Sequence, residues 1–94
     1  MNVKVVTTVN GSFICDLVSH DENFLVYKNA VVPVPIGENK MTFQSPDFFA
    51  SPNQEIMVYN HALVCMPYSP AESIEQHYRK IHGGIVSPPQ GLIL

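Results

Sequence analysis

Basic residues are scarce in this 94-residue chain, which holds five Lys and Arg against eight Asp and Glu and has a formal net charge of −3. A protein that depends on phosphate contacts usually carries a basic stripe. Here only Arg79 and Lys80 are adjacent. The composition therefore excludes nucleic-acid binding that rests on broad electrostatic attraction, and leaves only recognition through a few repeated pockets.

Cysteine is limited to Cys15 and Cys65. Both lie inside strands that the sequence predicts, and nothing in the sequence indicates a secretory context that would support a disulfide. We therefore expect two buried thiols that pack as small hydrophobic side chains. A disulfide between them is the alternative.

Long apolar runs are also missing. None approaches the ~20 residues that a membrane-spanning helix needs. The N-terminal sequence Met-Asn-Val-Lys lacks the apolar core of a signal peptide. We therefore expect a cytoplasmic protein with no membrane partner.

Catalytic signatures are absent as well: the sequence has no Cys-x-x-Cys, His-Glu-x-x-His, Gly-x-Ser-x-Gly or phosphate-binding glycine loop. Cys15 and His20 could be imagined as a nucleophile and its base. However, they are five residues apart on a strand and its turn, so they point to opposite faces. Asp16 and Asp21 fail the same test as paired carboxylates. We expect no enzymatic activity, no cofactor and no metal site.

What the sequence does contain is a series of short segments rich in Val, Ile, Phe, Leu and Tyr, which suit a half-buried sheet. Asn10-Gly11 is a tight-turn signal, and residues 20–23 form a second polar break. The predicted strands are Val3–Val9, Ser12–Ser19, Asn23–Val34, Glu55–Tyr59 and His61–Pro67. Five short antiparallel strands in so small a chain predict a mainly β fold, a small barrel.

Residues 40–52 form the least regular segment, a variable loop in which Lys40–Phe43 is expected to extend a hairpin. Pro33 and Pro35 remove donors from the sheet ladder, so the third strand should end near them or lie at an edge there. Phe48 and Phe49 are adjacent aromatic residues in the loop. Either they cover one end of the barrel, or they contact a neighbouring subunit.

A C-terminal helix is predicted over residues 69–83, packed on a β domain formed by residues 1–68. Ser69 is a good N-cap, Pro70 suits the first helical position, and Glu72 can complete a capping box. An apolar stripe follows at helical spacing: Ala71, Ile74, Tyr78 and Ile81.

The end of the helix is marked by Gly83-Gly84. His77 and His82 are five residues apart, which does not place two ligands on one face, so we expect both at the surface. Residues 84–94 form an apolar, proline-containing tail. We expect this tail to be mobile unless it docks on a partner.

Two segments carry a resemblance to a known family. Asn10-Gly11 is followed by an apolar strand, by the segment Leu17–Asp21, and by Phe24–Ala30. This order is similar to the first motif of the Sm-like family, in which an aspartate loop precedes a strand ending in Asn-Ala. Met57–Ala62, with the sequence Met-Val-Tyr-Asn-His-Ala, resembles the second motif of the bacterial Hfq branch, with its Tyr-Lys-His-Ala.

The resemblance implies the Sm-like fold, a five-stranded, strongly bent antiparallel sheet that forms a small open barrel. It also implies that the fourth strand of one subunit pairs with the fifth strand of the next. An open sheet of this size leaves two unpaired edges, and closing a ring satisfies them. The expected assembly is a homo-oligomeric ring of roughly five to seven subunits.

In such rings the two motif loops line the pore and hold one nucleotide per subunit. Carried over to this chain, Asp21 would brace the loop, and Asn23 or Phe24 would contact or stack on a base. Tyr59, Asn60 and His61 would come from the facing loop. The resemblance therefore implies binding of single-stranded RNA, U- or A-rich, with a role as an RNA chaperone or in RNA processing.

For several of these residues an alternative remains open. Phe24 and Tyr59 could be barrel core, which would make Asn23 the exposed candidate, and Tyr59 could also lie at a subunit interface. Asp21 could simply bond its own backbone.

The sequence departs from the family pattern at several positions. Cys15 replaces the glycine that usually permits the bend, and Leu25 replaces an asparagine. Asn60 replaces the basic residue of the second motif. The helix follows the last strand, whereas the family has it at the N-terminus. Together with the acidic balance, the aromatic loop and the apolar tail, these departures favour a second hypothesis: a structural or adaptor ring that binds protein partners without binding RNA.

Overall fold

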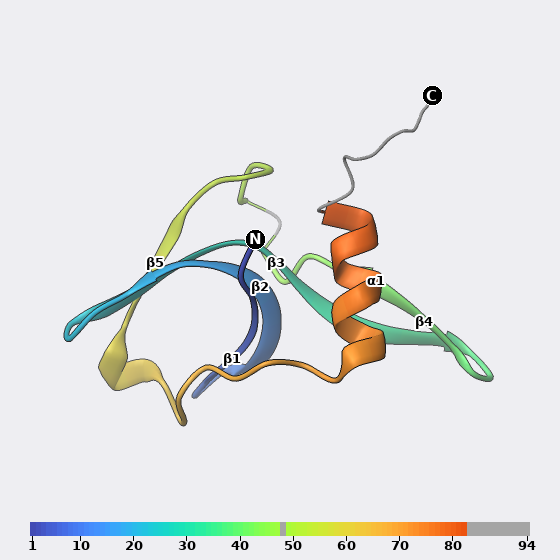
Figure 1. Cartoon of the computed structure of the whole chain (residues 1–94), viewed down its shortest axis with the longest axis horizontal. Coiled ribbons are helices and arrows are strands. Elements are labelled where there is room, and N and C mark those ends of the chain that lie inside the picture. The colour runs from blue at the N-terminus through green and yellow to red at the C-terminus, as the bar shows by residue number, and fades with distance from the viewer. Residues whose placement is uncertain (48, 83–94) are drawn as a thin grey trace.

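The computed structural model describes residues 1–47 and 49–82 (Figure 1). The elements in chain order are β1 (Val3–Thr8), β2 (Gly11–His20), β3 (Phe24–Gly37), β4 (Lys40–Gln44), β5 (Ile56–Tyr59), the 3₁₀ helix η1 (Asn60–Ala62) and α1 (Glu72–His82). This confirms a mainly β chain with an antiparallel five-stranded sheet and one short C-terminal helix. The sheet is not closed. The expectations for Phe48 and for residues 83–94 lie outside the described residues.

The β1–β2 hairpin forms where the sequence predicts it. Thr8 pairs with Gly11, so the two loop residues are Val9 and Asn10, one position earlier than Asn10-Gly11. Gly11 has a φ of 128°, which a residue with a Cβ rarely adopts. The Thr8 hydroxyl accepts a hydrogen bond of 3.1 Å from the backbone N–H of Asn10 and closes the turn.

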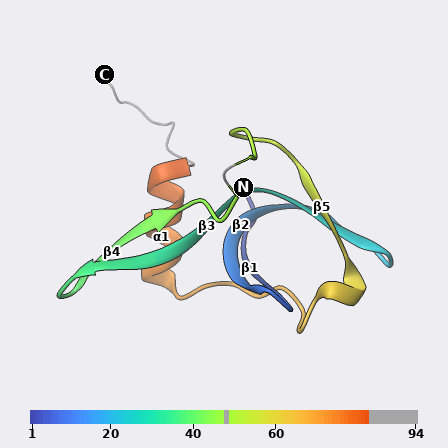
Figure 2. The same ribbon diagram turned by 180° about the vertical axis from the view of Figure 1, so that it is seen from behind.

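A β-bulge bends the sheet between β2 and β3. Ile14 pairs with Val31 and Asp16 with Lys28, so β3 has one residue more than β2 in this interval. Asn29 lies in the bulge with a φ of 54°, a left-handed conformation that asparagine tolerates better than most residues. Figures 1 and 2 show the resulting curve of β2. Cys15 lies at the bend and is fully buried.

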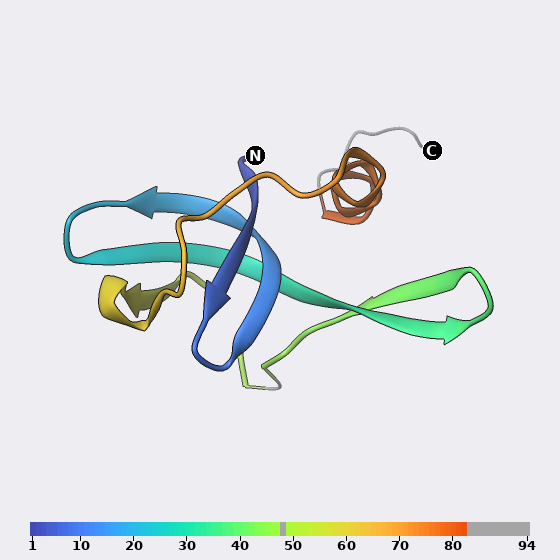
Figure 3. The same cartoon turned by 90° about the horizontal axis from the view of Figure 1, so that it is seen from below.

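Strand β3 is shared by two partners along its length. β5 pairs with Phe24–Tyr27, whereas β4 pairs with the distal half from Val32 to Gly37. Pro33 and Pro35 lie within β3, beyond its last pair with β2. The sheet tolerates these two prolines because the edge of β3 that faces away from β4 has no paired strand there among the described residues. The β3–β4 arm projects from the rest of the sheet in Figure 3.

The prediction of a strand over residues 61–67 is wrong. The chain instead forms the η1 turn and then an irregular segment that pairs with β1 at two isolated bridges, Thr8↔Leu63 and Val5↔Tyr68. Pro67 lacks an N–H, which interrupts a regular ladder here. The remaining strand of the sheet is β4, which pairs with β3 as the hairpin extension expected over Lys40–Phe43, within the segment otherwise assigned to a variable loop. Cys65 is consequently an exposed free thiol, and the expectation that it is buried is wrong.

Helix α1 begins three residues after the predicted cap. The backbone N–H of Glu75 donates to the carbonyl of Ala71 at 2.9 Å, so Ala71 occupies the cap position. Ser69 lies two residues before this cap and does not cap the helix, and its hydroxyl accepts a hydrogen bond of 3.1 Å from Lys4 Nζ. Within the part of the chain that the structure describes, no helix has the length and apolar character to cross a membrane.

The helix packs on the sheet through Ile74 and Tyr78, which join a core cluster with Val3, Ile14 and Val31. Ala71 and Ile81 belong to the predicted stripe but are exposed. Near the C-terminal end of α1, His82 packs against the sheet side of the helix where Ile81 was expected. The His82 ring lies 4.5 Å from that of Tyr78 and is partly buried, so the expectation that it is a surface residue is wrong. His77 is exposed as expected, with its ring 4.9 Å from that of Phe43.

A second core cluster lies under the curve of the sheet. It consists of Val6, Cys15 and Leu25, and Phe13, Leu17 and Tyr27 pack against it. This cluster ends near the β2–β3 turn, and the first cluster ends under α1. The two clusters thus support two opposite ends of the molecule.

Candidate functional site

The structure brings the predicted site residues together at one end of the sheet. They come from the β2–β3 turn, the start of β3, the end of β5 and η1, and this end lies far from α1 in Figure 1. We call this region the tip, defined as residues 20–24 and 59–61. It contains all six predicted residues: Asp21, Asn23, Phe24, Tyr59, Asn60 and His61.

Asp21 folds the turn of the tip. Its Oδ1 accepts hydrogen bonds from the backbone N–H groups of Asn23, at 2.8 Å, and Phe24, at 3.0 Å. The bond from Phe24, followed by that from Asn23, lowers the pKa of the Asp21 carboxyl because both stabilise the charged form. The carboxylate is therefore occupied with its own backbone and holds Asn23 in place.

Asn60 links the two loops of the tip. Its Nδ2 donates to the Asp21 carbonyl at 2.8 Å, and its backbone N–H donates to the Asn23 carbonyl at 2.9 Å. Its Oδ1 lies 3.0 Å from Nε2 of His20. The side chain is thus held on both its oxygen and its nitrogen, and one amide hydrogen remains for other contacts.

His20 is a tip residue that the sequence analysis missed as a site residue. It is 40 positions from Asn60, and the contact between them depends on how η1 packs against the turn. The strand pattern of β2 indicates only that His20 lies at a strand end. The one local signal of a role at the site was the position of His20 directly before Asp21 in the turn.

Tyr59 and His61 form the exposed face of the tip. Their ring centroids are 5.5 Å apart and the ring planes differ by 10°, so the two rings are stacked. Tyr59 is 61% exposed, which excludes a core position within this chain. Phe24 is partly buried and meets Tyr59 edge to face at 6.3 Å, so it supports the stack from one side.

The charge of the tip is acidic. Asp21 and Glu22 are both exposed, and residues 20–24 and 59–61 include no Lys or Arg. A phosphate group would therefore meet repulsion here. The chemistry that the tip offers a ligand is ring stacking together with hydrogen bonds from Asn23, His61 and the remaining amide hydrogen of Asn60.

The thiol of Cys15 is unsuited to nucleophilic chemistry. Its burial, and secondarily the neighbouring Asp16 carboxylate, raise the pKa of Cys15 to about 12. The reactive form of cysteine is the thiolate, so Cys15 remains inert near neutral pH. Among residues 1–47 and 49–82, no three His, Cys, Asp or Glu side chains are grouped so that they could hold a metal ion.

Comparison with models of known protein families gives no match, and comparison with curated proteins gives none either. Any assignment of function to the tip therefore depends on its own geometry and chemistry.

Proposed function

We propose that this chain assembles into an Sm-like homo-oligomeric ring of roughly five to seven subunits and binds single-stranded RNA, U- or A-rich, at its pore. The observation that carries the proposal is the exposed Tyr59–His61 stack beside the turn that Asp21 closes. A stacked base is worth ~1–3 kcal/mol. A ring with this property would act as an RNA chaperone or in RNA processing.

The contact between the two loops supports the proposal. The segments that resemble the two Sm-like motifs are joined by the hydrogen bonds of Asn60 to Asp21 and Asn23. One stack and a few amide groups make a weak pocket. A ring repeats that pocket, so affinity for a strand would come from several weak contacts made together.

Unpaired strand edges support self-association. Within the described residues, β4 and β5 each pair with β3 alone, so each has one open edge. Exposed apolar side chains lie on β5 and on the segment after η1: Met57, Val64 and Met66. An open edge beside apolar side chains favours pairing with another chain.

The segment after η1 supports the open-barrel form of this proposal. The backbone N–H of Val64 donates to the Thr7 carbonyl at 2.9 Å, and that of Val5 donates to the Tyr68 carbonyl at 2.7 Å. These bonds bring residues 63–68 alongside β1. The chain that follows β5 therefore runs along β1, at the other end of the bent sheet, as an open barrel requires.

Native mass spectrometry with and without oligo-uridine and oligo-adenosine tests the proposal. We expect a closed ring that takes up at least one of the two oligomers. The double variant Tyr59→Ala/His61→Ala should form the same ring with at least tenfold weaker binding, because two stacking faces are lost. Tyr68→Ala, which truncates an exposed tyrosine away from the tip, is the matched control. A monomer, or equal affinity in both variants, would contradict the proposal.

A second candidate function is that of an adaptor ring that binds protein. Phe49 is 95% exposed, and a partner that covered it would remove a large aromatic side chain from water. The acidic charge of the tip also favours a partner other than RNA. A ring that ignores both oligonucleotides, and loses a protein partner when Phe49 is changed to Ser, would favour this function.

A further inference from the structure

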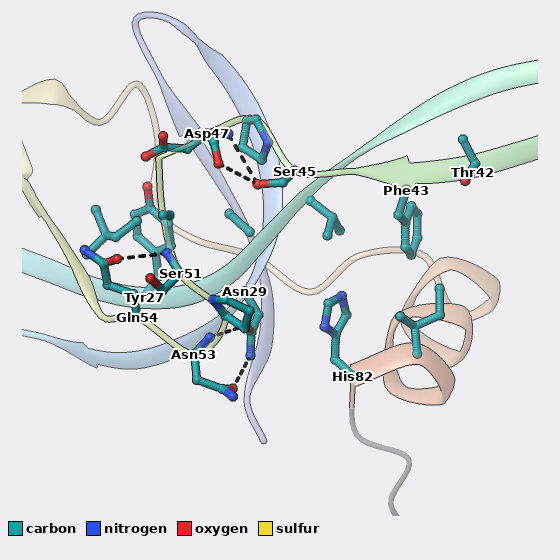
Figure 4. A pocket seen from close by; sticks show the side chains of 17 residues that line it. Tyr27, Asn29, Thr42, Phe43, Ser45, Asp47, Ser51, Asn53, Gln54 and His82 are labelled. Carbon is teal, nitrogen blue, oxygen red and sulfur yellow. Dashed lines mark hydrogen bonds between the residues drawn. The ribbon is translucent and has the colours of Figure 1, made fainter.

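Two concave regions of different chemistry lie outside the tip. The larger, which we call the pocket, has a volume of about 520 Å³ and lies between β3, β4, residues 45–54 and the C-terminal end of α1 (Figure 4). Asn29 Nδ2 donates to Asn53 Oδ1 at 3.0 Å, and the backbone N–H of Asn53 donates to Asn29 Oδ1 at 3.0 Å. The Tyr78 hydroxyl donates to the Asn29 carbonyl at 2.8 Å. Asn29 thus joins the walls of the pocket, and these polar groups are used by the chain itself.

The smaller region, which we call the groove, is apolar. It has a volume of about 240 Å³ and lies between the β1–β2 hairpin, β3 and the start of α1. None of the residues that line it is charged, and only Ser12 and Tyr68 carry a hydroxyl. Most of the other lining side chains are hydrophobic or proline: Val5, Phe13, Ile14, Pro33, Pro70 and Ile74. The groove is smaller than the ~300–1,000 Å³ of typical small-molecule sites, so it suits a few aliphatic side chains.

The edge of β3 beside the groove does not favour an added strand. β4 pairs with β3 from Val32 to Gly37, and the opposite edge of β3 has no paired strand there among the described residues. Pro33 and Pro35 lie in this part of β3 and have no N–H to donate. Contact in the groove therefore depends on apolar side chains rather than on backbone pairing.

Residues 83–94 supply an occupant of matching chemistry. The segment reads GGIVSPPQGLIL, which includes five aliphatic side chains of Val, Ile or Leu and no charged residue. Pro88 and Pro89 make it a poor partner for a sheet edge. Segments that contain proline instead dock in grooves lined by aromatic side chains, and Phe13 and Tyr68 provide such a lining. Aliphatic side chains that enter the groove would leave water, which favours docking.

The segment is long enough to reach the groove of its own chain. Ile74 lines the groove, and α1 ends at His82, ~12 Å further along the helix axis at 1.5 Å per residue. An extended chain covers roughly 3.3 Å per residue, so the residues from Pro88 onward can return to the groove. Ile81 shares a helix face with Ile74 and is 53% exposed. A segment that returns along α1 would also cover this side chain.

We propose that the groove holds the C-terminal segment of the same chain, with aliphatic side chains of residues 92–94 packed against Phe13, Tyr68 and Ile74. The connection through α1 gives the segment a high effective concentration at this groove, which favours it over the segment of a second copy. The docked segment keeps the apolar lining from contact with other chains. The proposal is independent of RNA binding at the tip, because groove and tip share no residue.

Methyl NMR of the full chain tests the proposal. We expect nuclear Overhauser contacts from the methyl groups of residues 92–94 to the rings of Phe13 and Tyr68, and amide order parameters above ~0.6 for residues 92–94. Ala71→Glu places a carboxylate beside the apolar groove, so these contacts should be lost and the order parameters should fall below ~0.6. Ser73→Glu is the matched control, because it adds the same charge in the same helical turn and Ser73 does not line the groove. Both positions are exposed at the start of α1, where a negative charge is favourable, so both variants should fold.

A second variant keeps the test decisive if Ala71→Glu does not fold. Leu92→Ser/Ile93→Ser/Leu94→Ser leaves the sequence of the sheet and of α1 unchanged. It should shift the ring resonances of Phe13 and Tyr68. Equal ring resonances in this variant and the wild type would overturn the proposal.

A mixture of isotope-labelled and unlabelled protein distinguishes docking within one chain from docking between copies. We expect the contacts of residues 92–94 to arise within single chains. Contacts between labelled and unlabelled chains would overturn the proposal, as would contacts of residues 92–94 to Tyr27 or Asn53 in the pocket instead of the groove. Equal spectra of residues 92–94 in Ala71→Glu and Ser73→Glu would also overturn it.

Discussion

The two ends of this molecule are each organised by an asparagine, but the surroundings differ. At the tip, Asn60 joins two turns and leaves the rings of Tyr59 and His61 in solvent. At the pocket, Asn29 joins a strand, a loop and a helix, and the ring that bonds to it, Tyr78, is fully buried. The same side chain therefore supports an exposed face in one place and the wall of a cavity in the other.

The two ends differ in the burial of Tyr78 and in the positive φ of Asn29, whereas the side-chain bonds between Asn29 and Asn53 are as exposed as the bond from Asn60 to Asp21. A hydrogen bond within a buried cluster cannot be replaced by water when one partner is removed, whereas an exposed one can. Most of the stability should therefore depend on the Asn29 end, and the tip should tolerate change with more effect on binding than on folding.

The largest expected effect comes from Tyr78. Tyr78→Ala removes a fully buried ring from the cluster under α1 and should cost about 3–5 kcal/mol in the free energy of unfolding, measured by urea denaturation. Tyr78→Phe keeps the ring and loses only the bond to Asn29, so it should cost about 1–2 kcal/mol. A loss below about 1 kcal/mol in the alanine variant would show that α1 is not part of the folded core.

The two asparagines should differ when each is changed to alanine. Asn29→Ala loses two hydrogen bonds and leaves an alanine at positive φ, so we expect about 2–3 kcal/mol of destabilisation. Asn60→Ala loses two bonds at ordinary φ and should cost about 1 kcal/mol, yet it should weaken the proposed RNA binding because only the backbone bond from residue 60 to Asn23 still ties η1 to the turn. Asn29→Gly, which relieves the strain at positive φ, is the control. Equal costs at the two sites would remove the contrast.

The smallest expected effects concern the pH dependence of folding stability, which should differ between the two ends of the molecule. The pKa of His82 is lowered by burial, so the unfolded chain binds its proton first and stability falls as pH drops below about 6.5. His82→Phe should remove this loss. The pKa of Asp21 is also lowered, but for an acid this means that stability is present above about pH 4 and is lost as pH falls through the folded value.

Asp21→Asn should flatten only the acidic part of the curve of stability against pH. Thermal unfolding of the wild type and the two variants between pH 7 and pH 3 checks both windows. A wild-type curve that is flat between pH 7 and pH 5, or one that His82→Phe leaves unchanged, would show that the imidazole is as hydrated in the folded chain as in the unfolded one.

Local sequence determined the elements that need few distant partners. Alternating apolar residues and the turn near Asn10-Gly11 predicted β1, β2 and most of β3. Helical spacing and charge order predicted α1 to within three residues at its start. The gathering of the six site residues followed from the order of two motif-like segments, because antiparallel pairing of β3 with β5 brings Phe24 opposite Tyr59.

Tertiary structure alone decided the rest. His82 rather than Ile81 lies on the packed face of α1, which depends on how the helix meets Tyr78 and the sheet. The exposure of Cys65 depends on the η1 turn that follows β5. The bond between His20 and Asn60, and the bonds of Asn29 to Asn53 and Tyr78, join residues 24 to 49 positions apart. Patterns of hydrophobicity and turn propensity describe neighbours along the chain, so they contain no information about polar pairs that only the bend of the sheet brings within hydrogen-bond distance.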